Sequence, residues 1–567
     1  MSNVYIVKDG KAQLSVVRYS KVGINQLSAI ERLVNKVNER SGTCIEVKKD
    51  TDLDKSIPVL SVGNNRWAKM FLMGDATSYE NTVAQHDGSI YALGYTTKGI
   101  VQALDRITDS LVSENGDVFV PESAFGTVPT VLPEKKDAFN DFWLTYYGPP
   151  GFSSNDPKEW NETDRRTLDD IIKFGVDEIP AYFFGYKDDE QSVSVIKSFI
   201  NEFYSHKIKV RPYFVNNGKL QQLFDEGKTD EIEADIKRTV ELFGDMEGIG
   251  QWGLYDEPLE DKQLKYCGFI RQCFHKHDPM DRPVYINMGP VTLQDWCNGE
   301  TVYDKLIEWT NPDYYCYDKY PFRVTDDGKP VMYEDNWYAN LEQNRSYAID
   351  GARNTGAILG AIKVGADPSR HDITQEFMDW QVNLMLAYHY RYLESYVYYP
   401  VHDFCMLGKG NVPTFRWHIA RKCNQYAKTV GRMLLNKRLD AVFHLRNCSI
   451  PLGHDGFKHD YPDIEENHYS FGTVTYFGYR GLGNVTGEDA MLSFFDDGTI
   501  IVTDKRCCDI DGGDHTVMLE GLKGDVEIFN GISGEWEIIQ TCKNARQTPN
   551  GLELKLTRSS QFILRAK

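Results

Sequence analysis

The chain has 567 residues, enough for roughly three to four domains, or fewer if one of them is an α/β barrel. Its 83 acidic residues outnumber 63 basic ones, for a formal net charge of -20, which argues against a nucleic acid or an anionic membrane as the main partner. The 11 cysteines are scattered and form no Cys-x-x-Cys pair, so we expect reduced thiols. The start lacks a secretory pattern and no apolar run approaches roughly 18 residues, so we expect a soluble, cytoplasmic protein.

Residues 1–130 predict a small, non-catalytic α+β domain. Strand patterns occur at 4–7, 12–19, 45–48 and 58–63, and Asp87-Gly88 predicts the turn of a hairpin over 82–95. Helical spacing predicts helices over 25–40 and 97–112. Prolines within 121–136 then indicate a linker.

From residue 137 to 437, strand and helix patterns alternate strictly, which indicates βα units and a parallel sheet. Eight strands are predicted, at 142–147, 178–186, 210–216, 250–257, 284–288, 314–320, 357–364 and 396–401. Helices are predicted between and after them, among them 190–205, 230–243, 261–275, 339–354, 375–391 and 414–435. This pattern predicts an α/β fold, a (β/α)8 TIM barrel, with its chemistry at the carboxyl ends of the strands.

Residues 438–567 predict a C-terminal β-sandwich. Short strands are expected at 472–477, 491–495, 499–503, 526–529, 536–540 and 552–556, with turns at Asp497-Gly498 and Asn530-Gly531. The segment 447–469 could fold over the barrel mouth, and it contains three histidines without the spacing of a metal site: His454, His459 and His468. We therefore predict no metal.

The stretch that carries the functional prediction is Gly250 to Pro258, which reads as a buried strand followed by Asp256 and Glu257. Adjacent carboxylates repel each other's charge and separate their pKa values, as general acid and base catalysis requires. The alternative is helix capping, since acids are favoured near helix N-termini and a helix is expected from about Leu259. At the end of strand four of a barrel, a catalytic pair is the preferred interpretation.

Other strand ends and the loops after them supply candidate substrate-binding groups. Hydroxyl, amide, carboxylate and aromatic groups are those that a sugar requires. The candidates are Tyr147, Asn216, Asn287, Trp296, Tyr317, Asp318, Tyr320, Trp337, Lys363 and Tyr399. Asp318 is the strongest of them, because it is an acid at the end of a buried strand beside four tyrosines. Each of the others has an ordinary packing or ion-pair alternative.

The order of parts, with "YDEP" at strand four and "YDKYPF" at strand six, resembles a bacterial glycoside hydrolase. The segment "DGSIYALGYTTKGIVQALDRI" resembles the non-catalytic N-terminal domain ahead of the barrel in glycoside hydrolase families 20, 67, 84 and 89. An Asp-Glu pair at strand four, with no carboxylate on strand seven before Asp367, resembles the β-N-acetylhexosaminidases of families 20 and 123. The His-x-Gly-Gly-Asp-Glu pattern of family 20 is not present, since Trp252 to Tyr255 stand in its place.

This resemblance implies substrate-assisted, retaining catalysis. The absence of a secretory pattern favours short imported oligosaccharides as substrates and an exo-acting enzyme. Glu257 would be the general acid and base, Asp256 would orient the 2-acetamido group, and Tyr317 or Tyr320 would bind the acetamido oxygen. Two alternatives stay open. The chain could cleave sugars with a plain 2-hydroxyl, with Asp318, Glu334 or Asp335 as the second carboxylate. It could also bind glycans without turnover, because a fold does not imply a function.

We therefore expect an oligosaccharide or glycoside as the partner, with no nucleic acid and no membrane. No cofactor is expected. The sequence does not decide between a monomer and a homo-oligomer, and it does not reveal the sugar or the linkage.

Overall fold

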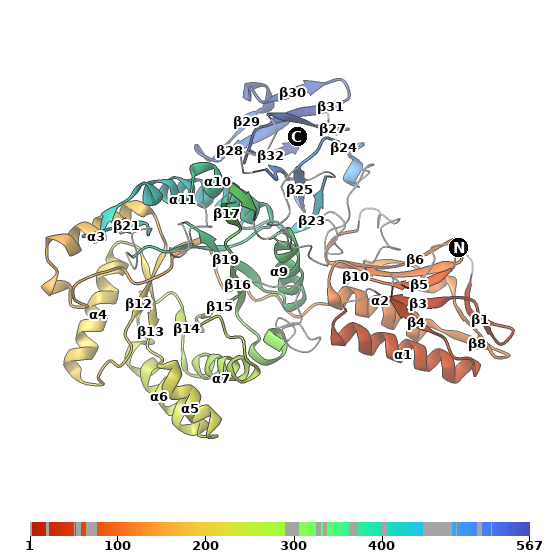
Figure 1. Cartoon of the computed structure of the whole chain (residues 1–567), viewed down its shortest axis with the longest axis horizontal. Coiled ribbons are helices and arrows are strands. Elements are labelled where there is room, and N and C mark those ends of the chain that lie inside the picture. Colours follow the sequence, from red (N-terminus) through yellow and green to blue (C-terminus); the bar gives the residue numbers. More distant parts are fainter. Residues whose placement is uncertain are drawn as a thin grey trace.

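The structure is a computed structural model that describes residues 3–18, 22–49, 52, 58–63, 76–289, 305–324, 330–332, 337–361, 372–399, 405–445, 479–483, 485–506, 513–522 and 524–566. Three parts follow one another along the chain. Figure 1 shows the middle part on the left, the N-terminal α/β part on the right and the C-terminal part, made of strands, at the top. Among the described residues, no helix has both the length and the apolar character needed to cross a membrane.

The N-terminal part has two sheets and two helices around one apolar core. An antiparallel sheet has the order β2-β1-β9-β8, and a mixed sheet has the order β10-β6-β7-β5-β3-β4. The strands are β1 (Val4–Lys8), β2 (Lys11–Ala12), β3 (Ser15–Arg18), β4 (Val47–Lys49), β5 (Val59–Val62), β6 (Glu80–His86), β7 (Ser89–Gly94), β8 (Val112–Glu114), β9 (Asp117–Val120) and β10 (Gly126–Pro129). The helices are α1 (Ile24–Ser41) and α2 (Thr97–Ser110).

The predicted hairpin is formed by β6 and β7. Its turn residues Asp87 and Gly88 have φ values of 47° and 77°, the left-handed conformation that a two-residue hairpin turn requires.

The middle part is a curled parallel sheet with the arrangement of a TIM-like barrel (Figure 1). Six strands pair in the order β11-β20-β19-β16-β15-β14, and β12 pairs with β13. Backbone contacts join the two groups: Asp177 N–H donates to Leu144 O over 2.8 Å, and Val210 bridges to Ile249 just before β14. The strands are β11 (Trp143–Tyr146), β12 (Glu178–Tyr182), β13 (Lys209–Tyr213), β14 (Trp252–Asp256), β15 (Val284–Met288), β16 (Tyr314–Asp318), β19 (Asn354–Gly360) and β20 (Tyr392–Tyr396).

Helices connect these strands and cover the outside of the sheet (Figure 1). They are α3 (Glu162–Phe174), α4 (Glu190–Ser205), α5 (Asn217–Asp225), α6 (Thr229–Phe243), α7 (Asp261–His277), a π-helical turn (Leu306–Thr310), α9 (Trp337–Gly351), α10 (Gln375–Ala387) and α11 (Phe415–Leu434). Two small hairpins are β17 (Phe322–Val324) with β18 (Pro330–Met332), and β21 (Leu407–Gly408) with β22 (Val412–Pro413).

The predicted position of strand eight is wrong. The sequence predicts it at 396–401, whereas β20 runs from Tyr392 to Tyr396 and α10 already ends at Ala387. The physical reason is Glu394, a charged residue on the inner face of the strand. It is fully buried because Arg211 on β13 donates to its two carboxylate oxygens over 2.7 and 3.1 Å. Because this ion pair joins residues that are far apart in the sequence, the apolar pattern of the segment alone does not predict the strand.

Inside the barrel, below the strand ends, lies a buried polar network around Arg211. Tyr285 O–H donates to Glu394 over 2.9 Å, and the Arg211 guanidinium lies 3.8 Å from the centre of the Tyr285 ring. Gln251 donates to Glu178 over 2.7 Å, and burial raises the pKa of Glu178 to about 7. Glu394 is therefore satisfied by a cation and a hydroxyl group, whereas Glu178 accepts from Gln251 and its Oε2 has no hydrogen-bond partner among the described residues.

The C-terminal part consists of two sheets that share an apolar core. Their orders are β23-β25-β26-β32-β28-β29 and β24-β27-β31-β30. The strands are β23 (Leu439–His444), β24 (Val485–Thr486), β25 (Ala490–Phe495), β26 (Ile500–Asp504), β27 (His515–Glu520), β28 (Val526–Asn530), β29 (Glu535–Ile538), β30 (Ala545–Thr548), β31 (Gly551–Leu556) and β32 (Gln561–Ala566). The predicted strand at 472–477 and His454, His459 and His468 lie outside the described residues.

The first of these sheets also contacts the barrel helices. Gln561 donates to the Asn383 carbonyl on α10 over 2.7 Å, and Ser559 donates to the Glu376 carbonyl over 2.9 Å. Ile563 and Val442 belong to the apolar core that contains the barrel residues.

Candidate active site

Asp256 and Glu257 lie at the carboxyl end of β14, at the barrel mouth, and both are exposed. The Glu257 N–H donates to the Asn287 carbonyl on the neighbouring strand over 2.8 Å. Glu257 has a φ of 50°, a conformation that is uncommon outside glycine and occurs often at functional sites. The capping alternative does not fit the structure, because Glu260 is the N-cap of α7 and forms a capping box with Gln263.

Asp256 is held by two hydrogen-bond donors from other strands. Tyr147, directly after β11, donates its hydroxyl to Asp256 Oδ2 over 2.7 Å. Asn287 on β15 donates Nδ2–H to Asp256 Oδ1 over 2.9 Å. Burial, followed by the Asp256 charge, raises the pKa of Tyr147, so this hydroxyl keeps its proton as a donor. The two contacts fix the orientation of the Asp256 carboxyl group.

A third carboxyl group, Asp318 at the end of β16, joins the pair. Its Oδ1 accepts from Asn287 Nδ2 over 3.2 Å, so Asn287 contacts both aspartates, and its side chain is hydrogen-bonded to Glu257. Burial and the charges of Glu257 and Asp256 raise the pKa of Asp318 to about 8. Burial and the Asp256 charge also raise the pKa of Glu257. A hydrogen bond between two carboxyl groups requires a proton, so this pair holds one at neutral pH.

Gly289 provides room for the Glu257 side chain. A Cβ placed on Gly289 would lie 3.2 Å from Glu257 Oε1, tighter than nearly all ordinary Cβ contacts. A larger residue here would push against the Glu257 carboxyl group, so we infer that Gly289 helps to position it.

Tyrosine rings line the mouth beside the carboxyl groups. Tyr396 lies 5.2 Å from Tyr147 and 5.2 Å from Tyr320, measured between ring centres. On the β12 side, Tyr182 stacks on Tyr213 at 4.7 Å, and Phe184 lies 5.5 Å from Tyr182 with 52% of its surface exposed. Tyr182, Phe184 and Tyr396 are absent from the sequence-based candidates. Reading the residues at the end of predicted strand two would have found the first two, and the misplaced strand eight explains the third.

The structure brings Tyr147, Asn287, Asp318 and Tyr320 together around the Asp256-Glu257 pair and places other candidates elsewhere. Tyr317 is 1% exposed and packs in the large core, where Tyr390 O–H contacts its hydroxyl at 3.5 Å. Trp337 is fully buried and stacks on Trp380 at 5.6 Å between ring centres. Neither side chain has an exposed surface for a sugar.

Asn216 and Tyr399 have structural contacts of their own. Asn216 is the N-cap of α5 and accepts from the Lys219 N–H over 3.2 Å. The ring of Tyr399 covers Gly151, where an added Cβ would lie 2.4 Å from a ring carbon. Trp296, Glu334, Asp335, Lys363 and Asp367 lie outside the described residues. Within the described part of the chain, no group of three or more His, Cys, Asp or Glu side chains is arranged to hold a metal ion.

No protein-family model matches the sequence, and no curated protein does. Solved structures with a likeness include a beta-galactosidase from the psychrophilic Marinomonas ef1, at 9% identity and a TM-score of 0.38 over 53% of this chain and 63% of that one. A glucosidase from Croceicoccus marinus has 10% identity and a TM-score of 0.37 over 76% of this chain and 98% of that one. The endo-beta-1,4-mannanase from Thermotoga petrophila has 9% identity and a TM-score of 0.35 over 68% and 95%. A likeness at these identities and TM-scores does not assign a function to this chain.

Proposed function

We propose that this protein is a glycoside hydrolase whose general acid is Glu257. The observation that carries the proposal is the group of three carboxyl groups at the strand ends, in which Tyr147 and Asn287 hold Asp256 in place and Asn287 also contacts Asp318. Burial and the neighbouring carboxylates raise the pKa of Asp318 to about 8, so the group retains a proton at neutral pH. A general acid must be protonated near the working pH and must reach the substrate. Glu257 meets both requirements, and tyrosine rings beside it offer stacking surfaces and hydroxyl groups to a sugar.

The finer proposal is substrate-assisted hydrolysis of β-N-acetylhexosaminides. The 2-acetamido oxygen of the sugar attacks the anomeric carbon as the glycosidic C–O bond breaks, and Glu257 gives its proton to the leaving oxygen. Glu257, now a carboxylate, then takes a proton from the water that attacks the anomeric carbon. In this scheme Asp256 accepts the acetamido N–H. We assign the acetamido oxygen to Tyr320, because Tyr317 is 1% exposed.

Two observations support this scheme over one that uses two protein carboxylates. The strand-seven segment Asn354–Ala361 carries no carboxylate among its described residues. Asp318 accepts from Asn287, and burial with the neighbouring carboxylates raises its pKa to about 8, so it is not the charged nucleophile that retaining glycosidases with two carboxylates use. We therefore assign Asp318 as the partner that shares a proton with Glu257 and keeps one proton on the pair at neutral pH.

The experiment is hydrolysis of paired aryl β-glycosides that differ only in 2-acetamido versus 2-hydroxyl, by wild type, Glu257→Gln, Asp256→Asn and Asp318→Asn. Glu226→Gln, an exposed glutamate that pairs with Lys228, is the matched control. We expect turnover of the acetamido sugars alone, its loss in Glu257→Gln and Asp256→Asn, and no change in the control.

Each other outcome points to a different function. Equal cleavage of 2-hydroxyl sugars, abolished by Asp318→Asn, would assign Asp318 as the second carboxylate. Binding of glycans without turnover, unaffected by Glu257→Gln, would contradict the enzyme proposal altogether.

A further inference from the structure

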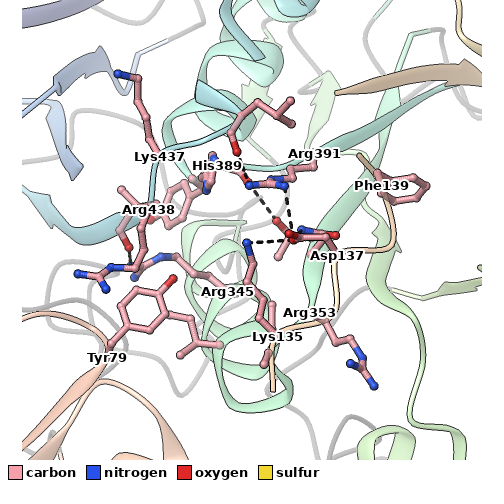
Figure 2. Close-up of a pocket in the computed structure, with 18 of the residues that line it drawn as sticks. Tyr79, Lys135, Asp137, Phe139, Arg345, Arg353, His389, Arg391, Lys437 and Arg438 are labelled. Atoms are coloured by element: carbon pink, nitrogen blue, oxygen red, sulfur yellow. Dashed lines mark hydrogen bonds and ion pairs between the residues drawn. The ribbon is translucent and has the colours of Figure 1, made fainter. Parts of the chain in front are cut away.

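A cavity lies at the opposite end of the barrel from the carboxyl groups. Its volume is about 670 Å³, within the range of small-molecule sites. It is lined by residues at the amino ends of β19 and β20, such as Asn354 and Arg391, by the linker before β11, and by Leu439 and Asp496 of the C-terminal part. The N-terminal part contributes Tyr79, so the cavity lies where all three parts meet (Figure 2).

The lining is strongly cationic in a protein of net charge -20. Two acidic side chains line it, Asp137 and Asp496. The cationic side chains that line it are Lys135, Arg345, Arg353, Arg391, Lys437 and Arg438. This local excess of positive charge is the feature of an anion site.

Two of these cations are paired with aspartates just outside the lining, Lys437 with Asp497 and Arg438 with Asp440. The contacts of the other cations use only part of their hydrogen-bonding capacity. Arg391 donates to Asp137 over 3.4 Å and to the Leu435 carbonyl over 2.5 Å, and Lys135 pairs with the same aspartate at 3.0 Å. Arg353 donates to the Pro312 carbonyl over 3.2 Å. A guanidinium group has five N–H donors, so these contacts leave capacity for a ligand.

Arg345 on α9 gives an independent indication. It is 4% exposed, and its Nη2 donates to Ser78 Oγ and to the Leu439 carbonyl, each over 2.8 Å. Its Nη1 is buried without a hydrogen-bond partner among the described residues. The guanidinium lies 4.5 Å from the centre of the Tyr95 ring, so its charge has a neighbour, but Nη1 still has a donor to spare, and an anion in the adjoining cavity would offer it an acceptor after a small side-chain movement.

His389 also lies in the cavity wall, close to the same positively charged side chains. Its Nε2 contacts the Leu434 carbonyl at 3.0 Å. Burial, followed by the charges of Arg391, Lys135 and Arg345, lowers the pKa of His389 to about 3. The ring is therefore neutral at neutral pH, and it adds a polar group to the wall without adding charge.

We propose that this cavity binds a small organic phosphate monoester. Guanidinium groups match phosphate oxygens in pairs, which favours a phosphate among small anions. The volume exceeds what a phosphate group alone would fill, and Phe139, Ile349 and Leu132 give apolar surface for an organic body. The site is separate from the carboxyl groups at the mouth and does not depend on the proposed glycosidase activity.

The experiment is calorimetric titration of the full chain with glucose 6-phosphate, inorganic phosphate and glucose, at constant ionic strength. We expect glucose 6-phosphate to bind and to raise the melting temperature, because a ligand of the folded state stabilises it. Glucose should not bind. If inorganic phosphate binds as tightly as glucose 6-phosphate, free phosphate is the ligand. If inorganic phosphate binds more weakly, the organic part of the monoester contributes to binding.

The variant Lys135→Gln/Arg353→Gln removes two cations from the cavity, and Lys135 is already 60% exposed. We expect at least about tenfold weaker binding in this variant, since hydrogen bonds to charged groups contribute that much. The control Arg238→Gln, on α6 and paired with Asp188, should bind as wild type does. Glu257→Gln should also bind as wild type does, which excludes binding at the mouth.

Absence of binding at millimolar concentration, or equal binding by the double variant and wild type, would overturn the proposal. Loss of binding in Glu257→Gln would move the phosphate to the barrel mouth and would overturn it as well. Hydrolysis by the double variant should equal that of wild type, so a failure of this proposal leaves the proposed function untouched.

Discussion

The barrel contains two clusters of carboxyl groups, and their surroundings differ. In the interior, Arg211 pairs with Glu394 at 2.7 Å and lies 3.8 Å from Glu178, while Gln251 donates to Glu178. At the mouth, no arginine or lysine of the described chain forms an ion pair with Asp256, Glu257 or Asp318, and neutral Tyr147 and Asn287 supply the donors. The three carboxyl groups at the mouth instead reduce their mutual repulsion by keeping a proton.

The comparison shows that the same side-chain chemistry serves two purposes. A carboxylate beside a buried guanidinium is electrically satisfied and holds strands together. A carboxyl group beside other carboxyl groups retains a proton that it can transfer. Four substitutions test this division between a structural interior and a chemical mouth.

The largest effect is expected at the mouth. Glu257→Gln keeps the size of the side chain and removes the transferable proton, so kcat should fall about 10²- to 10⁴-fold. The melting temperature should change little, because Glu257 is exposed. Steady-state hydrolysis and thermal unfolding measure the two quantities, and near-normal kcat in a folded variant would contradict the assignment.

In the interior the effect should fall on stability. Arg211→Met leaves Glu394 buried without its cation and should lower the free energy of unfolding by about 3–5 kcal/mol. Urea unfolding measures this change. Adding Glu394→Gln should recover part of the loss, because it removes the unpaired charge, and an unchanged free energy of unfolding in Arg211→Met would argue against the structural role of the interior cluster.

Asp318→Asn tests the shared proton through pH. The wild-type kcat should decline as pH rises through about 8, where the pair loses its proton. In the variant, Glu257 loses its proton without a neighbouring Asp318 charge, so the decline should move to lower pH. A pH profile that does not move would show that Asp318 does not hold the proton.

The same substitution predicts a stability change of definite sign. The folded-state pKa of Asp318 is raised, so folding stability from this group is fully present below its unfolded pKa near 4 and is lost as pH rises through about 8. Relative to wild type, Asp318→Asn should therefore gain at least about 1 kcal/mol at pH 9 compared with pH 4. Urea unfolding at the two pH values measures the difference.

The smallest effect is expected for Tyr147→Phe. It removes one donor from Asp256 and leaves the Asn287 contact in place, so activity should fall about tenfold with a stability change of about 1 kcal/mol. Kinetics with matched acetamido and hydroxyl substrates would show the loss on the acetamido sugar alone. An equal loss of activity on both substrates would show that Tyr147 does not act through the acetamido group.

The sequence predicts most of the site, because strands β14, β15 and β16 carry continuous apolar runs that end in polar groups. Asp256, Glu257, Asn287 and Asp318 follow from those strand ends alone. The sequence misplaces strand eight, where the charge of Glu394 is compensated by Arg211 on β13. Such compensation depends on contacts between distant residues, and it cannot be read from local pattern.

The cationic cavity also cannot be predicted from local sequence patterns. Its cations come from the linker, α9, the β20 start and the segment after α11, and no spacing along the chain connects them. The exclusion of Tyr317 and Trp337 from the mouth has a simpler reason. Alternate residues of a barrel strand face opposite sides, and an aromatic residue is equally suited to the core and to a sugar.

The Ser78 N–H donates to the Asp440 carbonyl over 2.7 Å, and Arg345 on α9 contacts both Ser78 and Leu439. When Ser78 leaves the ribosome, the barrel that supplies Arg345 and the strand that supplies Asp440 have still to be synthesised. The N-terminal part can therefore form its own core early during translation, but its docking surface is complete only after the rest of the chain has emerged. Synonymous changes that alter translation speed within the barrel should thus affect how long this surface stays exposed to chaperones.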